Sequence, residues 1–158
     1  MINKFRFFSA ALAIFFGGLA AAQAQDWAKA RLIDSPRHGE WVEYKSGART
    51  LKAFVVYPEK KEKAPVVLVI HEIFGMTDWV RGVCDQLAEA GVIAIAPDLL
   101  SGQSYPDVDA ARKSVPELNP EQVIGALNAP AQYAAKRPAA QWRTAWSGFD
   151  GGRGWACC

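Results

Sequence analysis

The sequence predicts an α/β fold with a mostly parallel sheet, and two apolar runs joined by a helical segment carry this prediction. Residues 66–70 are an unbroken run of valine, leucine and isoleucine, which is typical of a strand covered on both faces. Residues 92–96 form a second apolar run, of valine, isoleucine and alanine. A strand, a helix and a strand in succession favour a crossover unit of a parallel sheet. In such a sheet, ligands bind beyond the carboxyl ends of the strands.

The helix between the two runs has a start and a stop signal. Thr77 or Asp78 can cap its first turn, and we expect it to continue to Ala90. Gly91 follows, where a left-handed residue would end it.

A hairpin is predicted upstream of the first apolar run. Residues 40–45 and 50–57 have strand character and flank Ser46-Gly47. We therefore expect two antiparallel strands at one edge of the sheet.

The part of the chain after the second apolar run is less regular. Residues 101–116 are polar and rich in turn residues, so we expect a loop with a short helix over residues 108–113. Residues 119–122 then combine a capping residue, a proline at the first helical position and a glutamine in the capping-box position. The expected buried stripe of this helix is Val123, Leu127 and Ala131. Pro130 conflicts with a continuous helix, at about 3 kcal/mol.

Residues 1–24 are predicted to be a signal peptide rather than part of the fold. Lys4 and Arg6 precede an apolar run over residues 7–20, and a small-x-small cleavage site follows at residues 22–24. A membrane anchor is the alternative, but the run is shorter than the ~20 residues that a spanning helix needs. We expect a periplasmic or secreted domain over residues 25–158.

Charge and cysteine content narrow the function classes. Lys4 and Arg6 account for the whole net charge of +2, so the exported domain is neutral, with no basic stripe that would favour nucleic acid. Cys84 shares a helix face with three apolar residues and is predicted to be a small buried hydrophobe. Cys157 and Cys158 are adjacent. Because no cysteine pair has metal-ligand spacing, we assign no metal, disulfide or redox role.

Two motifs suggest a family. The sequence HEIFG occupies residues 71–75 directly after the first buried strand, and APDLL occupies residues 96–100 at the end of the second. In this spacing the chain resembles the dienelactone hydrolase family of α/β-hydrolases over about residues 41–152. The resemblance implies an α/β-hydrolase-type sheet that here ends after the nucleophile elbow. It also implies cofactor-free opening of lactone or ester bonds in a small-molecule substrate, through an acyl-enzyme.

The resemblance further implies site residues. Members of that family use a Cys-His-Asp triad with the cysteine on a G-x-C-x-G elbow, and a glutamate after the first core strand that controls the charge of the cysteine. Glu72 matches this glutamate. The backbone N–H groups of Ile73 and Gly151 match the two donors of the oxyanion hole. Residues 148–152 keep the elbow spacing, but Asp150 stands at the nucleophile position where cysteine is expected.

Two further polar residues have competing interpretations. His71 could be a general base, but within the motif it is expected to shape the oxyanion loop instead. Asp98 is expected to cap or hydrogen-bond the loop that it begins.

The departure at Asp150 leaves three hypotheses open. Because no histidine follows Asp150, the first is a truncated or frameshifted copy of a lactone hydrolase, with residues 141–158 partly out of frame. The second is a non-catalytic exported fragment or binding module. The third is a dehalogenase-like hydrolase that uses Asp150 as its nucleophile.

Overall fold

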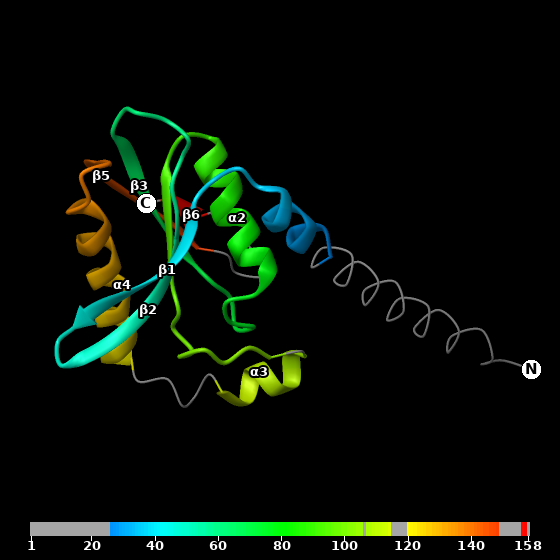
Figure 1. Ribbon diagram of the computed structural model, residues 1–158. Helices are drawn as coiled ribbons and strands as arrows, with labels where there is room; N and C mark the ends of the chain where they lie inside the picture. Colours follow the sequence, from blue (N-terminus) through cyan, green and yellow to red (C-terminus); the bar gives the residue numbers. More distant parts are fainter. Residues whose placement is uncertain (1–25, 106, 115–119, 149–155, 158) are drawn as a thin grey trace, which may run out of the picture.

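The structure is a computed structural model that describes residues 26–105, 107–114, 120–148 and 156–157 (Figure 1). The predicted signal peptide, Asn119 and the elbow residues Asp150 and Gly151 lie outside the described residues. Cys158 does so as well. Among the described residues, no helix has both the length and the apolar character that crossing a bilayer requires.

The described strands form one six-stranded mixed sheet in the order β1-β2-β4-β3-β5-β6. The element bounds are β1 Gly39–Ser46, β2 Arg49–Val56, β3 Ala64–Ile70, α2 Asp78–Glu89, β4 Ile93–Pro97, α3 Val108–Ser114, α4 Pro120–Ala135, β5 Ala140–Gly148 and β6 Ala156–Cys157. Strands β4, β3 and β5 are parallel and central, whereas β1, β2 and β6 pair antiparallel. The predicted hairpin, crossover unit and fold class are confirmed.

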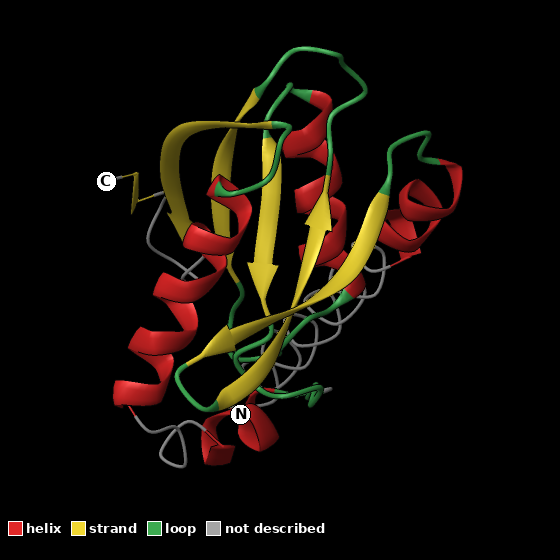
Figure 2. Cartoon of the chain, turned by 60° about the vertical axis from the view of Figure 1, so that its left-hand side comes forward, coloured by secondary structure: helices red, strands yellow, loops and turns green. Residues whose placement is uncertain are grey.

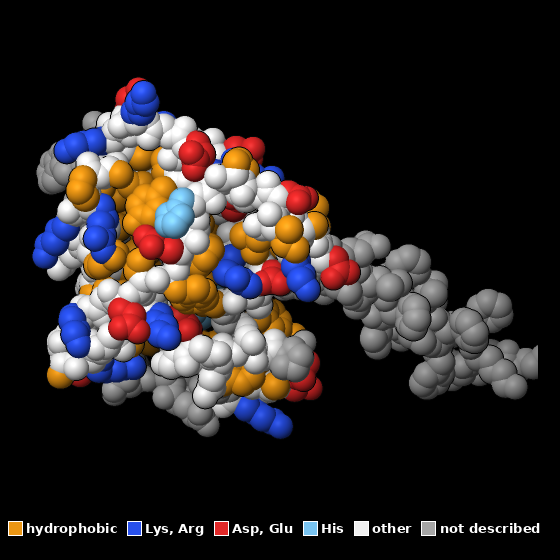
Figure 3. All heavy atoms as spheres, viewed as in Figure 1, with side chains coloured by type: hydrophobic (Ala, Val, Ile, Leu, Met, Phe, Trp, Pro, Cys, Tyr) orange, Lys and Arg blue, Asp and Glu red, His pale blue; other side chains and the backbone are white. Residues whose placement is uncertain are grey.

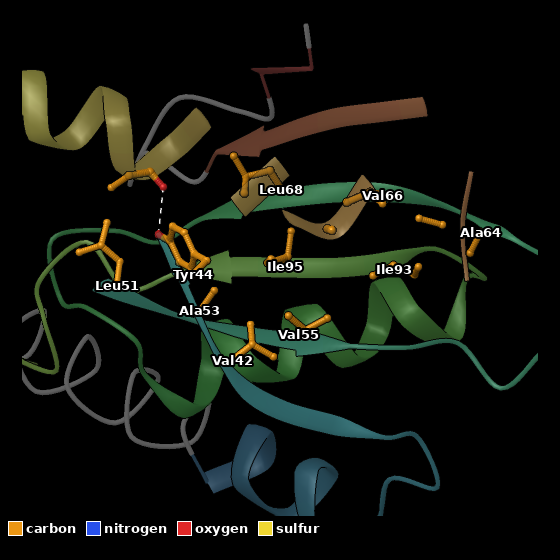
Figure 4. Packing of buried hydrophobic residues seen from close by; sticks show 13 residues of the cluster. Val42, Tyr44, Leu51, Ala53, Val55, Ala64, Val66, Leu68, Ile93 and Ile95 are labelled. Atoms are coloured by element: carbon orange, nitrogen blue, oxygen red, sulfur yellow. Dashed lines mark hydrogen bonds between the residues drawn. The ribbon is translucent and has the colours of Figure 1, made fainter. Parts of the chain in front are cut away.

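Helices α2 and α4 cover opposite faces of the sheet (Figure 2). The face under α4 is built from alternate residues of the central strands, including Val66, Leu68, Ile93 and Ile95 (Figure 4). The intervening residues Val69, Ala94 and Ala96 pack toward α2. Because side chains alternate along a strand, runs with no polar member are buried on both faces.

Helix α2 begins and ends as the sequence predicts. The Thr77 side chain accepts a hydrogen bond from the backbone N–H of Val80 at 3.4 Å. Gly91 has φ +90°, the left-handed conformation that favours glycine after a helix. Cys84 is fully buried in this helix, and burial raises the pKa of its thiol to about 12. The thiol is therefore a packing group and not a nucleophile.

The prediction for α4 needs a correction. The helix continues through Pro130, and its buried positions are Ala126, Pro130 and Ala134 rather than the predicted stripe. Val123 and Leu127 are only half-buried, while the Ala131 side chain is not among the described ones. Proline has no N–H for the carbonyl four residues earlier, which here is that of Ala126.

Tyr44 of β1 supplies the missing donor. Its hydroxyl donates a hydrogen bond to the Ala126 carbonyl at 3.1 Å, drawn as a dashed line in Figure 4. Burial raises the pKa of Tyr44 to about 12, so the hydroxyl keeps its proton and remains a donor. A residue of the edge strand thus satisfies the backbone group that proline leaves unpaired, and the helix passes through Pro130 at a smaller free-energy cost.

The segment before β1 is joined to α2 by charge. Residues 26–34 are helical, and Ala28 packs at Gly82. The carboxylate of Asp85, almost fully buried, accepts hydrogen bonds from Arg31 and Arg37, each at 2.8 Å, and from the hydroxyl of Ser35. This cluster anchors the N-terminal segment on the outer side of α2.

The visible surface carries mixed charge. In Figure 3, basic and acidic side chains of the described residues are interspersed around an apolar area. Trp27, Ile33, Trp41, Val108 and Ile124 are the large apolar residues that the described part of the chain exposes.

Candidate functional site

The carboxyl edge of the central strands is formed by two loops that bind each other. Residues 71–77 follow β3 and residues 98–105 follow β4. The N–H of Tyr105 donates to the carbonyl of Phe74 at 3.2 Å, and Gly75 pairs with Ser104 in an isolated antiparallel bridge. Backbone hydrogen bonds thus hold the HEIFG motif against the loop that follows APDLL.

The motif contains a tight turn. The N–H of Gly75 donates to the carbonyl of Glu72 at 3.2 Å, which closes a β-turn with Ile73 and Phe74 at its centre. Gly75 has φ +84°, and a Cβ there would overlap the carbonyl oxygen of Gln103. Glycine is therefore required at this position, both by its conformation and by the approach of the second loop.

His71 is buried and uses both ring nitrogens. Its Nε2 lies 3.0 Å from the backbone nitrogen of Leu99, and its Nδ1 lies 2.7 Å from the carbonyl oxygen of Glu72. Because an amide N–H can only donate, Nε2 is an acceptor, so the proton is on Nδ1 and is donated to Glu72. Burial is the largest influence on this imidazole and lowers its pKa, which favours the neutral form.

This geometry supports one of the two interpretations of His71. A general base needs a ring nitrogen that is available to substrate, and both nitrogens here are engaged by backbone groups. The imidazole therefore bridges the two loops, as the expectation of a loop-shaping role requires.

Asp98 organises the second loop. It is buried, and its carboxylate accepts hydrogen bonds from the N–H groups of Leu100 at 3.2 Å and Gly102 at 2.6 Å. Ser101 and Gly102 both have positive φ, so the chain turns sharply around this carboxylate. The expected structural role of Asp98 agrees with these contacts.

The structure places two of the four predicted site residues. Glu72 and Ile73 are half-buried and lie in the turn after β3. The roles of Asp150 and Gly151 stay predictions, because these residues lie outside the described part of the chain. Strand β5 ends at Gly148, which lies opposite Ile70 at the end of β3. The described chain therefore runs toward the elbow from the same sheet edge as the turn.

Sequence reasoning missed the polar network around Asp85 and the bridging contacts of His71. An aspartate beside buried Cys84 on an amphipathic helix was a signal that some partner must compensate its charge. Its arginine partners, however, lie 54 and 48 residues away along the chain. Within the described residues, no group of three or more His, Cys, Asp or Glu side chains is arranged to hold a metal ion.

Comparisons with known proteins agree with this architecture. The family model described as "Dienelactone hydrolase family" matches residues 51–153. A protein of Aquifex aeolicus assigned the name carboxymethylenebutenolidase is 32% identical over 83 residues, which cover 51% of this chain and 35% of that protein. A protein of Yersinia pestis assigned the same name is 31% identical over 110 residues, covering 65% and 41%.

A solved structure extends the likeness to three dimensions. The crystal structure of a protein of Klebsiella pneumoniae assigned as a dienelactone hydrolase is 30% identical, with a TM-score of 0.60. The match covers 71% of this chain and 50% of that one. The match thus covers half of that solved structure and less than half of the length of the two curated relatives.

Proposed function

Because the chain belongs to the dienelactone hydrolase family, we propose that it opens lactone or ester bonds of a small-molecule substrate through an acyl-enzyme, after export to the periplasm or the medium. The observation that carries the proposal is the Glu72–Gly75 turn at the carboxyl edge of β3. The hydrogen bond that closes this turn uses the Glu72 carbonyl and the Gly75 N–H. The Ile73 N–H is not the group that closes the turn, and we assign it to a ligand at the sheet edge.

The Ile73 N–H would act on the carbonyl under attack. When a nucleophile adds to an ester or lactone carbonyl, negative charge develops on its oxygen, and a fixed donor stabilises that charge without reorganisation. Gly151 would supply the second donor from the elbow. Glu72, beside the first donor, would control the proton of the nucleophile, because a carboxylate close to a thiolate disfavours the charged thiolate.

Residue 150 decides which nucleophile acts. A cysteine at this position would form a thioester with the acyl group and release the alcohol, and water would then release the acid. Sequencing the encoding DNA from codon 141 onward tests the shifted-frame hypothesis: a neighbouring frame that encodes a cysteine at the elbow supports it. DNA in which no neighbouring frame encodes a cysteine at the elbow contradicts it.

The aspartate itself favours a second candidate, the hydrolysis of alkyl halides. The Asp150 carboxylate would displace halide to form an alkyl ester, which water then cleaves. Halide release from a haloalkane, with no turnover of esters, would replace the lactone proposal by this one.

The central test removes the backbone N–H of residue 73. Ile73 is the second residue of the turn, where proline is favoured, so Ile73→Pro keeps the turn and deletes the N–H. We expect kcat for p-nitrophenyl acetate and for dihydrocoumarin to fall by about 10²–10³, as for loss of one oxyanion donor. Ile73→Val retains the N–H and is the matched control.

The outcomes separate the hypotheses. Equal rates for Ile73→Pro and Ile73→Val would remove Ile73 from the site. If the unaltered chain turns over no ester, lactone or haloalkane, the non-catalytic binding module becomes the better description. Export is tested separately, by fractionating cells and sequencing the mature N-terminus, which we expect at Gln25.

A further inference from the structure

We infer that His71 is a positioning residue that aims the Ile73 N–H, by locking the peptide group between Glu72 and Ile73 against the loop after β4. This inference rests on the proposed function, because it assigns His71 a part in forming the same oxyanion hole. It adds to that function a residue that neither contacts the reacting atoms nor exchanges a proton with them.

The argument begins with the peptide plane. The Glu72 carbonyl and the Ile73 N–H belong to one peptide group, and in a trans peptide these two bonds point in opposite directions within a rigid plane. The structure has no cis peptide bond in its described residues. A contact that holds the Glu72 oxygen in place therefore also sets the direction of the Ile73 N–H.

Two donors hold that oxygen. The His71 Nδ1–H approaches it at 2.7 Å and the Gly75 N–H at 3.2 Å. The bond from Gly75 lies within the turn and moves with it. The bond from His71 also links the turn to the second loop, because the other ring nitrogen is tied there.

The far end of the imidazole is anchored by buried groups. Nε2 accepts from the Leu99 N–H at 3.0 Å, and Leu99 sits between Asp98 and Leu100 in the turn that the Asp98 carboxylate holds. The turn that Asp98 holds is thus connected to the peptide that bears the oxyanion donor through the backbone of residues 98–100 and the two hydrogen bonds of His71. Residues 98–100 directly follow β4, a central strand, so the imidazole is fixed relative to the centre of the sheet.

The bridge operates only with a neutral ring. A protonated Nε2 would face the Leu99 N–H with a second donor, and one of the two bonds would be lost. The described charged group that acts on the imidazole is the Asp98 carboxylate, which favours the proton, but burial outweighs it.

The test compares two substitutions in the full chain. His71→Leu removes both contacts, whereas His71→Gln retains one donor and one acceptor on its amide. His38→Gln is the matched control, since the His38 side chain is 67% exposed. Thermal unfolding of each variant checks that it folds.

The first measurement does not need activity. Because the chain has only two histidines, long-range ¹H–¹⁵N NMR can assign the tautomer of each. We expect His71 to carry its proton on Nδ1 at neutral pH. We also expect faster amide exchange at Gly75 in His71→Leu, with little change in His71→Gln or His38→Gln. A proton on Nε2, or unchanged Gly75 exchange in a folded His71→Leu variant, overturns the inference.

The second measurement is kinetic, with p-nitrophenyl acetate as the probe. We expect His71→Leu to lower kcat by roughly 10- to 100-fold, as for a misplaced donor, with KM changed less than about twofold. His71→Gln should recover most of the loss. Equal kcat in all folded variants overturns the positioning role. If the unaltered chain has no hydrolytic activity, the proposed function fails, and the exchange data still support or overturn the bridge.

Discussion

Buried polar side chains have different partners on the α2 side of the sheet and at the functional edge. On α2, the Asp85 carboxylate binds two guanidinium groups from a segment outside the sheet. At the edge, His71 and Asp98 bind backbone N–H and C=O groups of neighbouring loops. The first arrangement joins two pieces of chain through charge. The second sets the direction of peptide groups.

The two kinds of partner predict different effects of substitution. Removing one member of a buried ion pair leaves a charge without its partner, so the effect falls on stability. Removing a side chain that orients a neutral peptide leaves no unpaired charge, so stability falls less and the local geometry changes. The α2 cluster, which is Asp85 with its two arginines, therefore contributes mainly to stability. The edge cluster, which is His71 and Asp98, contributes mainly to the geometry of the site.

The largest expected effect tests the α2 cluster. Asp85→Ala should lower the free energy of unfolding by about 3 kcal/mol, the lower end of the range for a broken buried pair, because Arg31 and Arg37 keep some contact with solvent. Urea unfolding measures this. Glu89 pairs with the same arginines but its side chain is 58% exposed, so Glu89→Ala should change the value by less than about 1 kcal/mol. Similar effects of both substitutions would contradict the distinction.

The pH dependence of the Asp85 cluster provides a second measure of the same pair. Burial alone would raise the pKa of Asp85, but hydrogen bonds from Arg37 and Ser35 and the charges of both arginines hold it below its ordinary value. A lowered carboxyl pKa contributes stability above the unfolded value of about 3.9, and this contribution is lost as the pH falls through the lower folded value. We expect the stability difference between the unaltered chain and Asp85→Asn to shrink below about pH 4.

A smaller effect is expected from the glycine that holds the two edge loops together. Gly75→Ala places a methyl group against the Gln103 carbonyl at a residue with positive φ. We expect the free energy of unfolding to fall by about 2 kcal/mol and kcat to fall as well. Gly47 also has positive φ, in the β1–β2 turn, but a Cβ there meets nothing within 4 Å. Gly47→Ala should therefore lower stability by only about 1 kcal/mol and leave kcat unchanged. Equal kinetic effects would show that the loop contact does not support the site.

Tyr44 extends the edge pattern to α4, because it also serves a backbone group. Tyr44→Phe leaves the Ala126 carbonyl unpaired and should lower stability by about 1–2 kcal/mol. In a Pro130→Ala background the new N–H can bond to that carbonyl, so the same change should have a much smaller effect. A double-mutant cycle measured by chemical unfolding detects the coupling. Additive effects would refute the idea that Tyr44 compensates for Pro130.

The smallest effect is expected from protonation of His71. Its pKa is lowered in the fold, mainly by burial, so the unfolded chain binds this proton more readily. The free energy of unfolding does not depend on His71 protonation above about pH 6.5. It declines as the pH falls below that value toward the lower pKa of the folded state. We expect the protection of the Gly75 amide, which is its exchange rate compared with that of an unstructured amide at the same pH, to fall over this range in the unaltered chain and not in His71→Gln. A flat profile in both would mean that the ring charge does not affect the turn.

Much of the fold was predictable because its signals are local. The β3 and β4 runs, the cap at Thr77 and the stop at Gly91 depend on neighbours within a few residues, and all are confirmed. The HEIFG motif likewise predicted the family. The buried face of α4 was predicted only in part. Leu127 packs against the core as expected, but the fully buried positions are Ala126, Pro130 and Ala134, and β1 replaces the donor that proline lacks.

The sequence by itself determined the strands β1 to β4, the α2 helix and the family, because apolar periodicity, capping residues and a short motif are written in contiguous residues. Only the tertiary structure decided which distant groups satisfy the buried polar atoms. Asp85 meets Arg31 and Arg37, Tyr44 meets the Ala126 carbonyl, and the two nitrogens of His71 meet two different loops. Hydrogen bonds and ion pairs depend on distances of about 3 Å, and folding alone brings such groups together across many residues of chain.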